Sequence, residues 1–112
     1  MDTIKKQTTL TPKSMTKPYT ETIQEKYGTN ERYIIRTFSK DVEETKLIWH
    51  RDHNTRKIHV LQSSGWKLQT DDSLPLELKV GKEYIITQGE YHRLLKGTDD
   101  LIIRIQERIM DN

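Results

Sequence analysis

Residues 81–92, GKEYIITQGEYH, constrain the architecture of this chain more than any other stretch. Gly81 precedes the short apolar run Tyr84–Ile86, and Gly89 follows it. Glycine is favoured where a turn needs a backbone conformation that other residues rarely adopt, so the two glycines are expected to bound a β-strand. His92 is then expected to begin the next strand, which places a histidine beside a tight turn.

Other short strands are expected along the rest of the chain, separated by turn-forming residues. The strands expected are 32–38, 45–50, 56–61, 66–70, 74–80 and 101–106, and the Ser63–Gly65 turn is expected to join 56–61 to 66–70 as a hairpin. Seven or eight short strands without a long helix predict an all-β fold, an antiparallel sandwich or barrel.

Side chains alternate between the two faces of a strand, which predicts the core. Arg56 shares a face with two aliphatic residues of its strand, so it is expected at the inner mouth of the barrel. The aliphatic residues expected to face the core are Ile58, Val60, Leu74, Leu76, Leu78, Leu101, Ile103 and Ile105.

The same alternation predicts a polar cluster of His50, Asp52, Arg56 and His92 on an apolar wall. Two histidines and one carboxylate can hold a metal ion such as iron(II) and leave coordination positions open. Alternatively, Arg56 pairs with Asp52 in a pocket without metal. The residue pattern alone leaves both possibilities open.

The spacing of Gly81, Gly89 and His92 resembles the second sequence motif of the cupin family, with Thr87 where proline is usual. The resemblance covers roughly residues 33–106. It implies a cupin-like antiparallel β-barrel of the jelly-roll type. Small single-domain cupins, some of them from bacteriophages, also resemble the region around Trp49.

The first cupin motif is retained only in part. His50 stands at its first histidine, while Asp52, Arg56 and Ser63 replace a histidine, a glutamate and a glycine. In metal-binding cupins these histidines and the glutamate, with the histidine of the second motif, hold one metal ion. The resemblance therefore implies either a divalent transition metal (Fe, Mn, Ni or Zn) on His50, Asp52 and His92, or a site without cofactor.

Three functions follow as hypotheses. The first is binding of a small anionic or polyhydroxyl ligand in a pocket of His50, Asp52, Arg56, His92 and Trp66. The second is a metal-dependent cupin enzyme of the dioxygenase or isomerase type, and the third is a non-catalytic assembly module. Trp66 has core packing as its simpler alternative, and the sequence identifies no catalytic residue.

An oxygenase that uses 2-oxoglutarate is disfavoured. Such enzymes need a basic residue about ten positions after the last histidine, where Ile102 stands, and Arg104 is expected on the outer face. His53 is expected in a solvated loop that could supply a ligand, and His59 on the outer face of its strand.

Composition limits the domain organisation. The chain of 112 residues has 19 basic and 17 acidic residues and no cysteine, which predicts one domain and excludes disulfides and thiolate metal sites. Residues 1–20 are expected to form a polar arm and residues 21–112 the barrel domain. We expect a cytoplasmic homodimer, in the host cytoplasm if a phage encodes it, that binds neither a membrane nor nucleic acid.

Overall fold

The computed structural model describes residues 17–25 and 28–108, which form two antiparallel sheets. The elements are β1 (Thr20–Glu25), β2 (Glu31–Phe38), the 3-10 turn η2 (Glu44–Lys46), β3 (Arg56–Gln62), β4 (Lys67–Thr70), β5 (Leu76–Glu77), β6 (Glu83–Ile86), β7 (His92–Leu95) and β8 (Leu101–Arg108). The all-β antiparallel fold expected from the sequence is confirmed, and its two sheets are consistent with a jelly roll.

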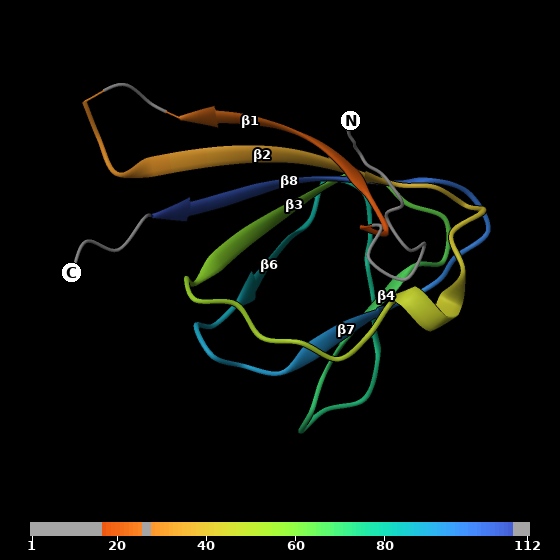
Figure 1. Cartoon of the computed structure of the whole chain (residues 1–112). Coiled ribbons are helices and arrows are strands. Elements are labelled where there is room, and N and C mark those ends of the chain that lie inside the picture. Colours follow the sequence, from red (N-terminus) through yellow and green to blue (C-terminus); the bar gives the residue numbers. More distant parts are fainter. Residues whose placement is uncertain (1–16, 26–27, 109–112) are drawn as a thin grey trace, which may run out of the picture.

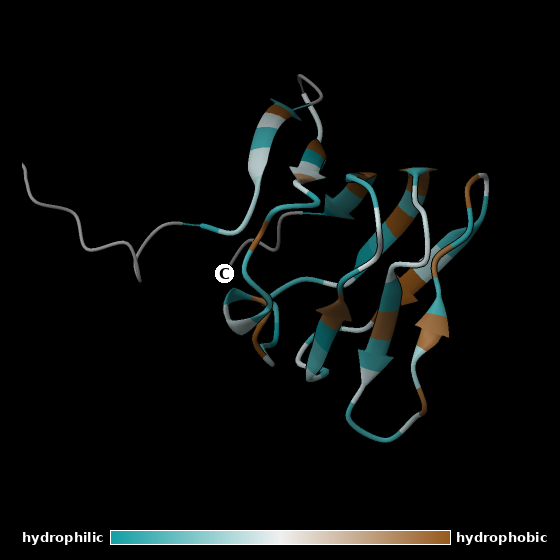
Figure 2. Cartoon of the chain, turned by 90° about the vertical axis from the view of Figure 1, so that its right-hand side faces the viewer, coloured by the Kyte–Doolittle hydropathy of each residue, from teal (hydrophilic) through white to brown (hydrophobic). Residues whose placement is uncertain are grey.

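The five-stranded sheet has the order β1-β2-β8-β3-β6, and the smaller sheet has the order β5-β4-β7. Figure 1 shows β1, β2, β8 and β3 as one curved layer, with β4 and β7 in a second layer below it. Figure 2 shows hydrophobic segments on strands of both layers. The buried residues contributed by the two sheets and the loops next to them form one cluster: Ile34, Phe38, Ile58, Val60, Trp66, Leu68, Leu78, Ile86, Leu101, Ile103 and Ile105.

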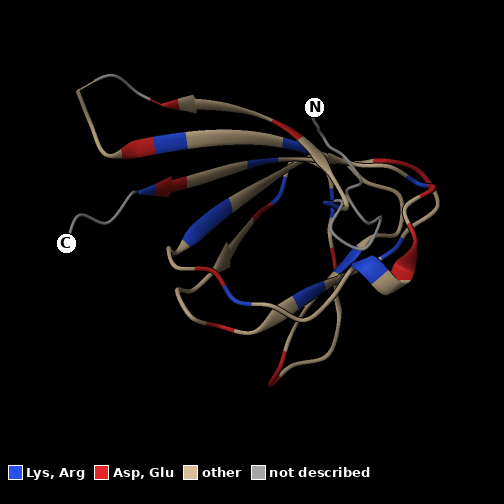
Figure 3. Cartoon of the chain, in the orientation of Figure 1, with Lys and Arg blue, Asp and Glu red and all other residues tan. Residues whose placement is uncertain are grey.

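The inner face of the large sheet consists of rows that cross β2, β8 and β3. The central row is apolar and pairs Ile34 with Ile105, and Ile105 with Ile58. The next row toward the C-terminal end of β8 pairs Arg32 with Glu107, and Glu107 with Arg56. Figure 3 shows acidic and basic segments meeting at this end of the three strands. A charged row therefore borders the hydrophobic core.

The Gly81–His92 stretch folds as expected. β6 lies between Gly81 and Gly89, whose φ angles of 84° and 77° fall in the left-handed region that favours glycine. His92 is the first residue of β7. The backbone N–H of Gly89 donates to the carbonyl oxygen of Asp52 at 3.0 Å, so the second glycine turn also anchors the loop that carries Asp52.

Several expected elements differ from the structure. The hairpin of 56–61 with 66–70 is wrong, because β3 pairs with β6 and β8 while β4 pairs with β5 and β7. The expected strand 74–80 is reduced to Leu76–Glu77, and of its three leucines only Leu78 is buried. The expected strand 45–50 is a 3-10 turn followed by a single bridge at His50.

The start of the chain shows one further difference. β1 was not expected, since all but one of its residues are exposed; its backbone pairs along β2 over six residues. The expected arm lies outside the described residues, apart from Lys17 to Tyr19 and the first residue of β1. Among the described residues, no helix is long and apolar enough to cross a membrane.

Candidate functional site

His50 and His92 are brought together by their backbones. The N–H of each residue donates to the carbonyl oxygen of the other, at 3.0 Å and 2.9 Å, and this isolated bridge joins the chain before β3 to β7. Directly opposed residues in an antiparallel bridge place their side chains on the same side. The two imidazole rings consequently lie 4.3 Å apart, centroid to centroid.

The hydrogen bonds of the two rings determine which nitrogen faces the pocket. Nδ1 of His50 lies 3.0 Å from the carbonyl oxygen of Ile48, and Nδ1 of His92 lies 2.9 Å from that of Glu90. A carbonyl only accepts, so each Nδ1 carries a proton and donates it. When the rings are neutral, both Nε2 atoms have a free lone pair, which is the form that binds a metal ion.

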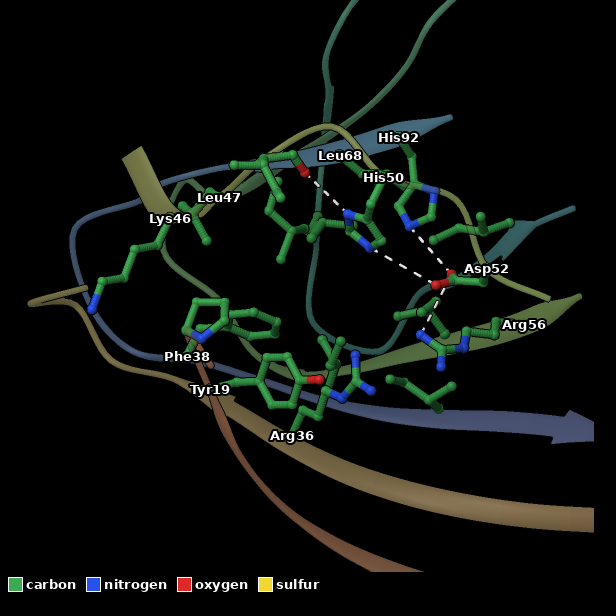
Figure 4. A pocket seen from close by; sticks show the side chains of 18 of the residues that line it. Tyr19, Arg36, Phe38, Lys46, Leu47, His50, Asp52, Arg56, Leu68 and His92 are labelled. Carbon is green, nitrogen blue, oxygen red and sulfur yellow. Dashed lines mark hydrogen bonds and ion pairs between the residues drawn. The ribbon is translucent and has the colours of Figure 1, made fainter. Parts of the chain in front are cut away.

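The carboxylate of Asp52 faces both histidines (Figure 4). Its Oδ1 is 3.8 Å from Nε2 of His50, and its Oδ2 is 3.3 Å from Nε2 of His92 and 3.4 Å from Nη1 of Arg56. These are ion-pair distances, and Oδ2 is buried without accepting a hydrogen bond of good geometry from any described residue. Oδ2 is therefore only partly satisfied by His92 and Arg56.

The charges around Asp52 shift the pKa values of the cluster. Burial raises the pKa of Asp52, but the contacts with His92 and Arg56 outweigh burial and hold that pKa below its usual value. For His92, burial lowers the pKa, while Asp52 and the carbonyl oxygen of Glu90 raise it, and the net shift is upward. The cluster therefore favours the carboxylate form of Asp52 next to a proton-binding imidazole.

Arg56 has a second partner, which the sequence analysis missed. Its Nε donates to Oε2 of Glu107 at 2.8 Å, a shorter contact than the one to Asp52, and Arg32 binds the other carboxylate oxygen of Glu107. Burial raises the pKa of Glu107, but the bonds from the two arginines lower it below its usual value. The expected pair of Arg56 and Asp52 is thus part of a network that also includes Glu107 and Arg32.

The signal for Glu107 was present in the sequence. Leu101, Ile103 and Ile105 were assigned to the core by alternation, and the same alternation continues to Glu107, which is only 3% exposed. The expected strand stopped at Gln106, two residues before β8 ends at Arg108.

A cavity of about 740 Å³ lies between the two sheets, and the Asp52 cluster forms part of its wall. Most of the remaining wall is aliphatic, contributed by both sheets, with Arg36 and Lys46 at other points of the lining. Pockets for small organic molecules have this combination of an apolar wall and a few polar groups.

Four of the five residues predicted for the pocket line this cavity: His50, Asp52, Arg56 and His92. Trp66 does not line it. Its side chain is fully buried in the core, where Nε1 donates to the carbonyl oxygen of Asp99 at 2.6 Å, and Gly97 packs so closely that a Cβ there would lie 2.5 Å from the indole. The core-packing alternative for Trp66 is therefore the one observed.

The remaining candidates lie away from the cavity. Trp49 is 40% exposed and carries the guanidinium of Arg93 over its ring at 4.8 Å. His53 is exposed in the loop after Asp52, and His59 pairs with Glu83 at 3.0 Å. None of these residues is part of the cavity lining.

The donor set of His50, Asp52 and His92 fits a divalent metal ion. One donor atom from each residue lies within 4.8 Å of the others, and the two Nε2 lone pairs together with a carboxylate oxygen of Asp52 supply three ligands. Arg56 stands beside these donors, but Glu107 and Arg32 complete a network in which two arginines and two carboxylates carry no net charge. The repulsion expected between Arg56 and a metal is thereby reduced.

Comparison of the sequence with protein-family models and with curated proteins gives no match. Comparison with solved structures gives clear similarities. A cupin domain from Bordetella pertussis is 16% identical, with a TM-score of 0.62, and the match covers 86% of this chain and 99% of that one. A cupin-2 domain protein from Shewanella frigidimarina is 13% identical with a TM-score of 0.63, and the match covers 86% of both chains.

DMSP lyase DddQ from Ruegeria pomeroyi is also similar, with 10% identity and a TM-score of 0.63. The match covers 72% of this chain but only 39% of the lyase, so this chain corresponds to less than half of that enzyme. At these identities the similarity concerns the fold. The structure has two antiparallel sheets around a cavity, and His50 and His92 are bridged in the cavity wall. Together with the structural matches, these features show that this chain has the cupin fold.

Proposed function

We propose that this chain binds a small organic molecule in the cavity between its sheets, with the Asp52 cluster contacting the ligand. The observation that carries this proposal is the cavity itself, whose largely aliphatic wall includes the side chains of His50, Asp52, Arg56 and His92. A ligand hydroxyl or amine would form hydrogen bonds with the polar groups of this cluster. Within residues 17–25 and 28–108 the side chains leave a cavity of about 740 Å³, whereas a pocket closed by side chains would favour the assembly-module hypothesis.

The test is a screen of small molecules followed by NMR of the side-chain methyl groups. We expect ligands to shift the methyl resonances of Ile103, Ile105 and Leu68, which line the cavity. Leu94→Trp should fill the cavity and abolish these shifts, whereas the matched variant Leu61→Trp, at a residue that is 48% exposed, should leave them unchanged. Shifts confined to the outer surface across a diverse panel would refute the proposal.

A second function, a metal-dependent enzyme, is favoured by the convergence of the three donors. A divalent metal on His50, Asp52 and His92 would act as a Lewis acid toward a ligand in the same cavity. The residues of this chain would hold it through both Nε2 atoms and the carboxylate, while the Ile48 and Glu90 carbonyl groups fix the ring orientations.

Metal binding is tested with protein purified without a histidine tag and stripped with EDTA. Calorimetric titration with manganese, iron(II), nickel and zinc should give one site per chain, and His50→Ala and His92→Ala should each abolish it. His59→Ala removes a histidine outside the cavity and is the matched control. Equal loss in the control, or no saturable binding by the wild type, would leave the cavity as a metal-free binding site.

A further inference from the structure

Arg36 lies on the same inner face as the Asp52 cluster, but in a different part of the cavity. It is four residues along β2 from Arg32 in the charged row, which corresponds to about 13 Å at about 3.3 Å per residue. The apolar row of Ile34, Ile105 and Ile58 lies between the two. Figure 4 shows Arg36 and Tyr19 along the lower edge of the cavity and the Asp52 cluster at its upper right.

The guanidinium of Arg36 is fixed but not fully used. Its Nε donates to Oε1 of Glu21 at 2.6 Å, and its Cζ lies 4.0 Å above the ring of Tyr19. Tyr19 in turn packs against Phe38 at a centroid distance of 5.3 Å. Arginine has five N–H donors, and the terminal nitrogens of Arg36 make no other hydrogen bond or ion pair within residues 17–25 and 28–108.

A half-buried guanidinium that lines a cavity and is held on an aromatic ring favours a planar anion. Two N–H groups of arginine match the two oxygens of a carboxylate, and stacking on Tyr19 lowers the entropy lost on binding. The side chain of Arg36 is 13% exposed, so a bound carboxylate would be partly shielded from water. Lys46, which also lines the cavity, adds positive charge; its Nζ is 3.9 Å from Glu43, which is largely exposed.

We propose that Arg36 forms a carboxylate subsite and that the ligand of this cavity is an elongated monocarboxylic acid with an apolar body. The carboxylate binds the terminal nitrogens of Arg36, the body lies over Ile103 and Ile105, which line the cavity, and the far end reaches the Asp52 cluster. This inference rests on the proposed function of the cavity. It deepens that function by stating the chemical class of the ligand and the direction in which it lies.

Glu21 provides the sharpest test, because it competes with the ligand for Arg36. Glu21 lies on the edge strand β1 directly opposite Arg36. Replacing it as Glu21→Gln removes a negative charge and leaves the guanidinium without its carboxylate partner. The variant should bind a carboxylate more tightly than the wild type, and Arg36→Gln should bind it more weakly. A purely structural role for the Glu21–Arg36 pair predicts no such opposite changes.

The experiment titrates octanoate and, separately, 1-octanol into EDTA-treated full-length protein, followed by methyl NMR. For the wild type, octanoate should bind roughly tenfold more tightly than 1-octanol, as expected for a partly buried charge-assisted hydrogen bond. Arg36→Gln should remove this preference and leave 1-octanol binding nearly unchanged. Arg51→Gln loses the same charge at an exposed residue outside the cavity lining and should behave as the wild type.

The outcomes separate this inference from the function on which it rests. Equal affinity for octanoate and 1-octanol in the wild type overturns the carboxylate subsite, while binding of 1-octanol still supports a ligand cavity. Absence of cavity shifts with both probes also overturns the subsite, and the broader screen then decides the cavity's function. If Arg36→Gln does not fold, Glu21→Gln alone decides, because unchanged or weaker octanoate binding contradicts the proposal.

Discussion

Two polar clusters lie side by side on the inner side of the sheets. They differ in how many of their carboxylate oxygens accept hydrogen bonds of good geometry. In the first, both carboxylate oxygens of Glu107 accept hydrogen bonds from Arg32 and Arg56, and the carboxylate is almost completely buried. In the second, Asp52 meets His50, His92 and Arg56 only at 3.3 to 3.8 Å. Both clusters share Arg56, but the contacts of Asp52 are longer than those of Glu107.

This difference indicates that two adjacent clusters have different roles, one in stability and the other in binding. A saturated, buried ion network has no capacity left for a ligand, and its removal exposes uncompensated charges. An unsaturated carboxylate on a cavity wall has lone pairs available for a metal ion or a ligand donor. We therefore expect Glu107 to matter mainly for stability and Asp52 mainly for binding.

The largest expected effect comes from Glu107→Ala. The change leaves Arg32 and Arg56 facing each other without their shared carboxylate, and we expect the free energy of unfolding to fall by about 3 kcal/mol, since both arginines are partly exposed. Urea unfolding measures this loss as a lower midpoint. Glu77→Ala, at an exposed position of β5, should change the midpoint little, and equal losses in both variants would contradict a structural role for the network.

Arg56→Glu tests how the two clusters are linked, and we expect a loss of about 2 kcal/mol in stability. The change removes one partner of Glu107 and places three carboxylates near one another, which disfavours the metal-free protein. The same carboxylates should raise affinity for manganese, iron(II) or nickel by roughly tenfold or more, because a repelling charge becomes an oxygen donor.

Calorimetry of wild type and Arg56→Glu measures this change in affinity. Lys57→Glu makes the same charge change at the next position of β3, on the opposite face of the strand, and is the control. Tight metal binding by the wild type that Arg56→Glu fails to improve would show that Arg56 does not oppose the metal.

The contrast between the clusters also shows what the sequence could predict. His50, Asp52, Arg56 and His92 were predicted to share one wall from alternation and from motif spacing, and the structure places all four on the cavity lining. Local periodicity suffices for Arg56 and His92, which begin β3 and β7. His50 and Asp52 lie outside the regular strands, and His50 is positioned by its bridge to His92. Glu107 followed from the same rule and was missed only through the strand boundary.

Other features depend on tertiary placement, which local patterns do not contain. β1 is a polar edge strand held largely by backbone pairing with β2, so its side chains give no hydrophobic signal. Leu74 and Leu76 alternate like core residues, yet they are 85% and 55% exposed, because the second sheet has only three strands and β5 lies at its edge. The expected hairpin fails for a related reason: β3 and β4 are consecutive in the sequence but belong to different sheets.

The pH dependence of stability should distinguish the clusters further. The pKa of Glu107 is lowered in the folded state, so its contribution is present above its ordinary value of 4.5 and is lost as pH falls through the folded pKa. We expect Glu107→Gln to have a flatter dependence of unfolding free energy on pH between about pH 5 and pH 2 than the wild type. A dependence as steep as that of the wild type would mean that Glu107 is not the group responsible.

The smallest expected change in stability is that of Asp52→Asn. The replacement keeps the shape of the side chain, Arg56 keeps its bond to Glu107, and the lost contacts are long, so the loss should be about 1 kcal/mol, well below that of Glu107→Ala. Binding should respond far more strongly, because the amide nitrogen or oxygen that takes the place of Oδ2 supplies a poor metal ligand and no negative charge. Thermal unfolding and metal titration of Asp52→Asn, with Asp71→Asn in an exposed turn as control, measure the two effects separately. A stability loss comparable to that of Glu107→Ala would place Asp52 within the structural network and remove the distinction between the two clusters.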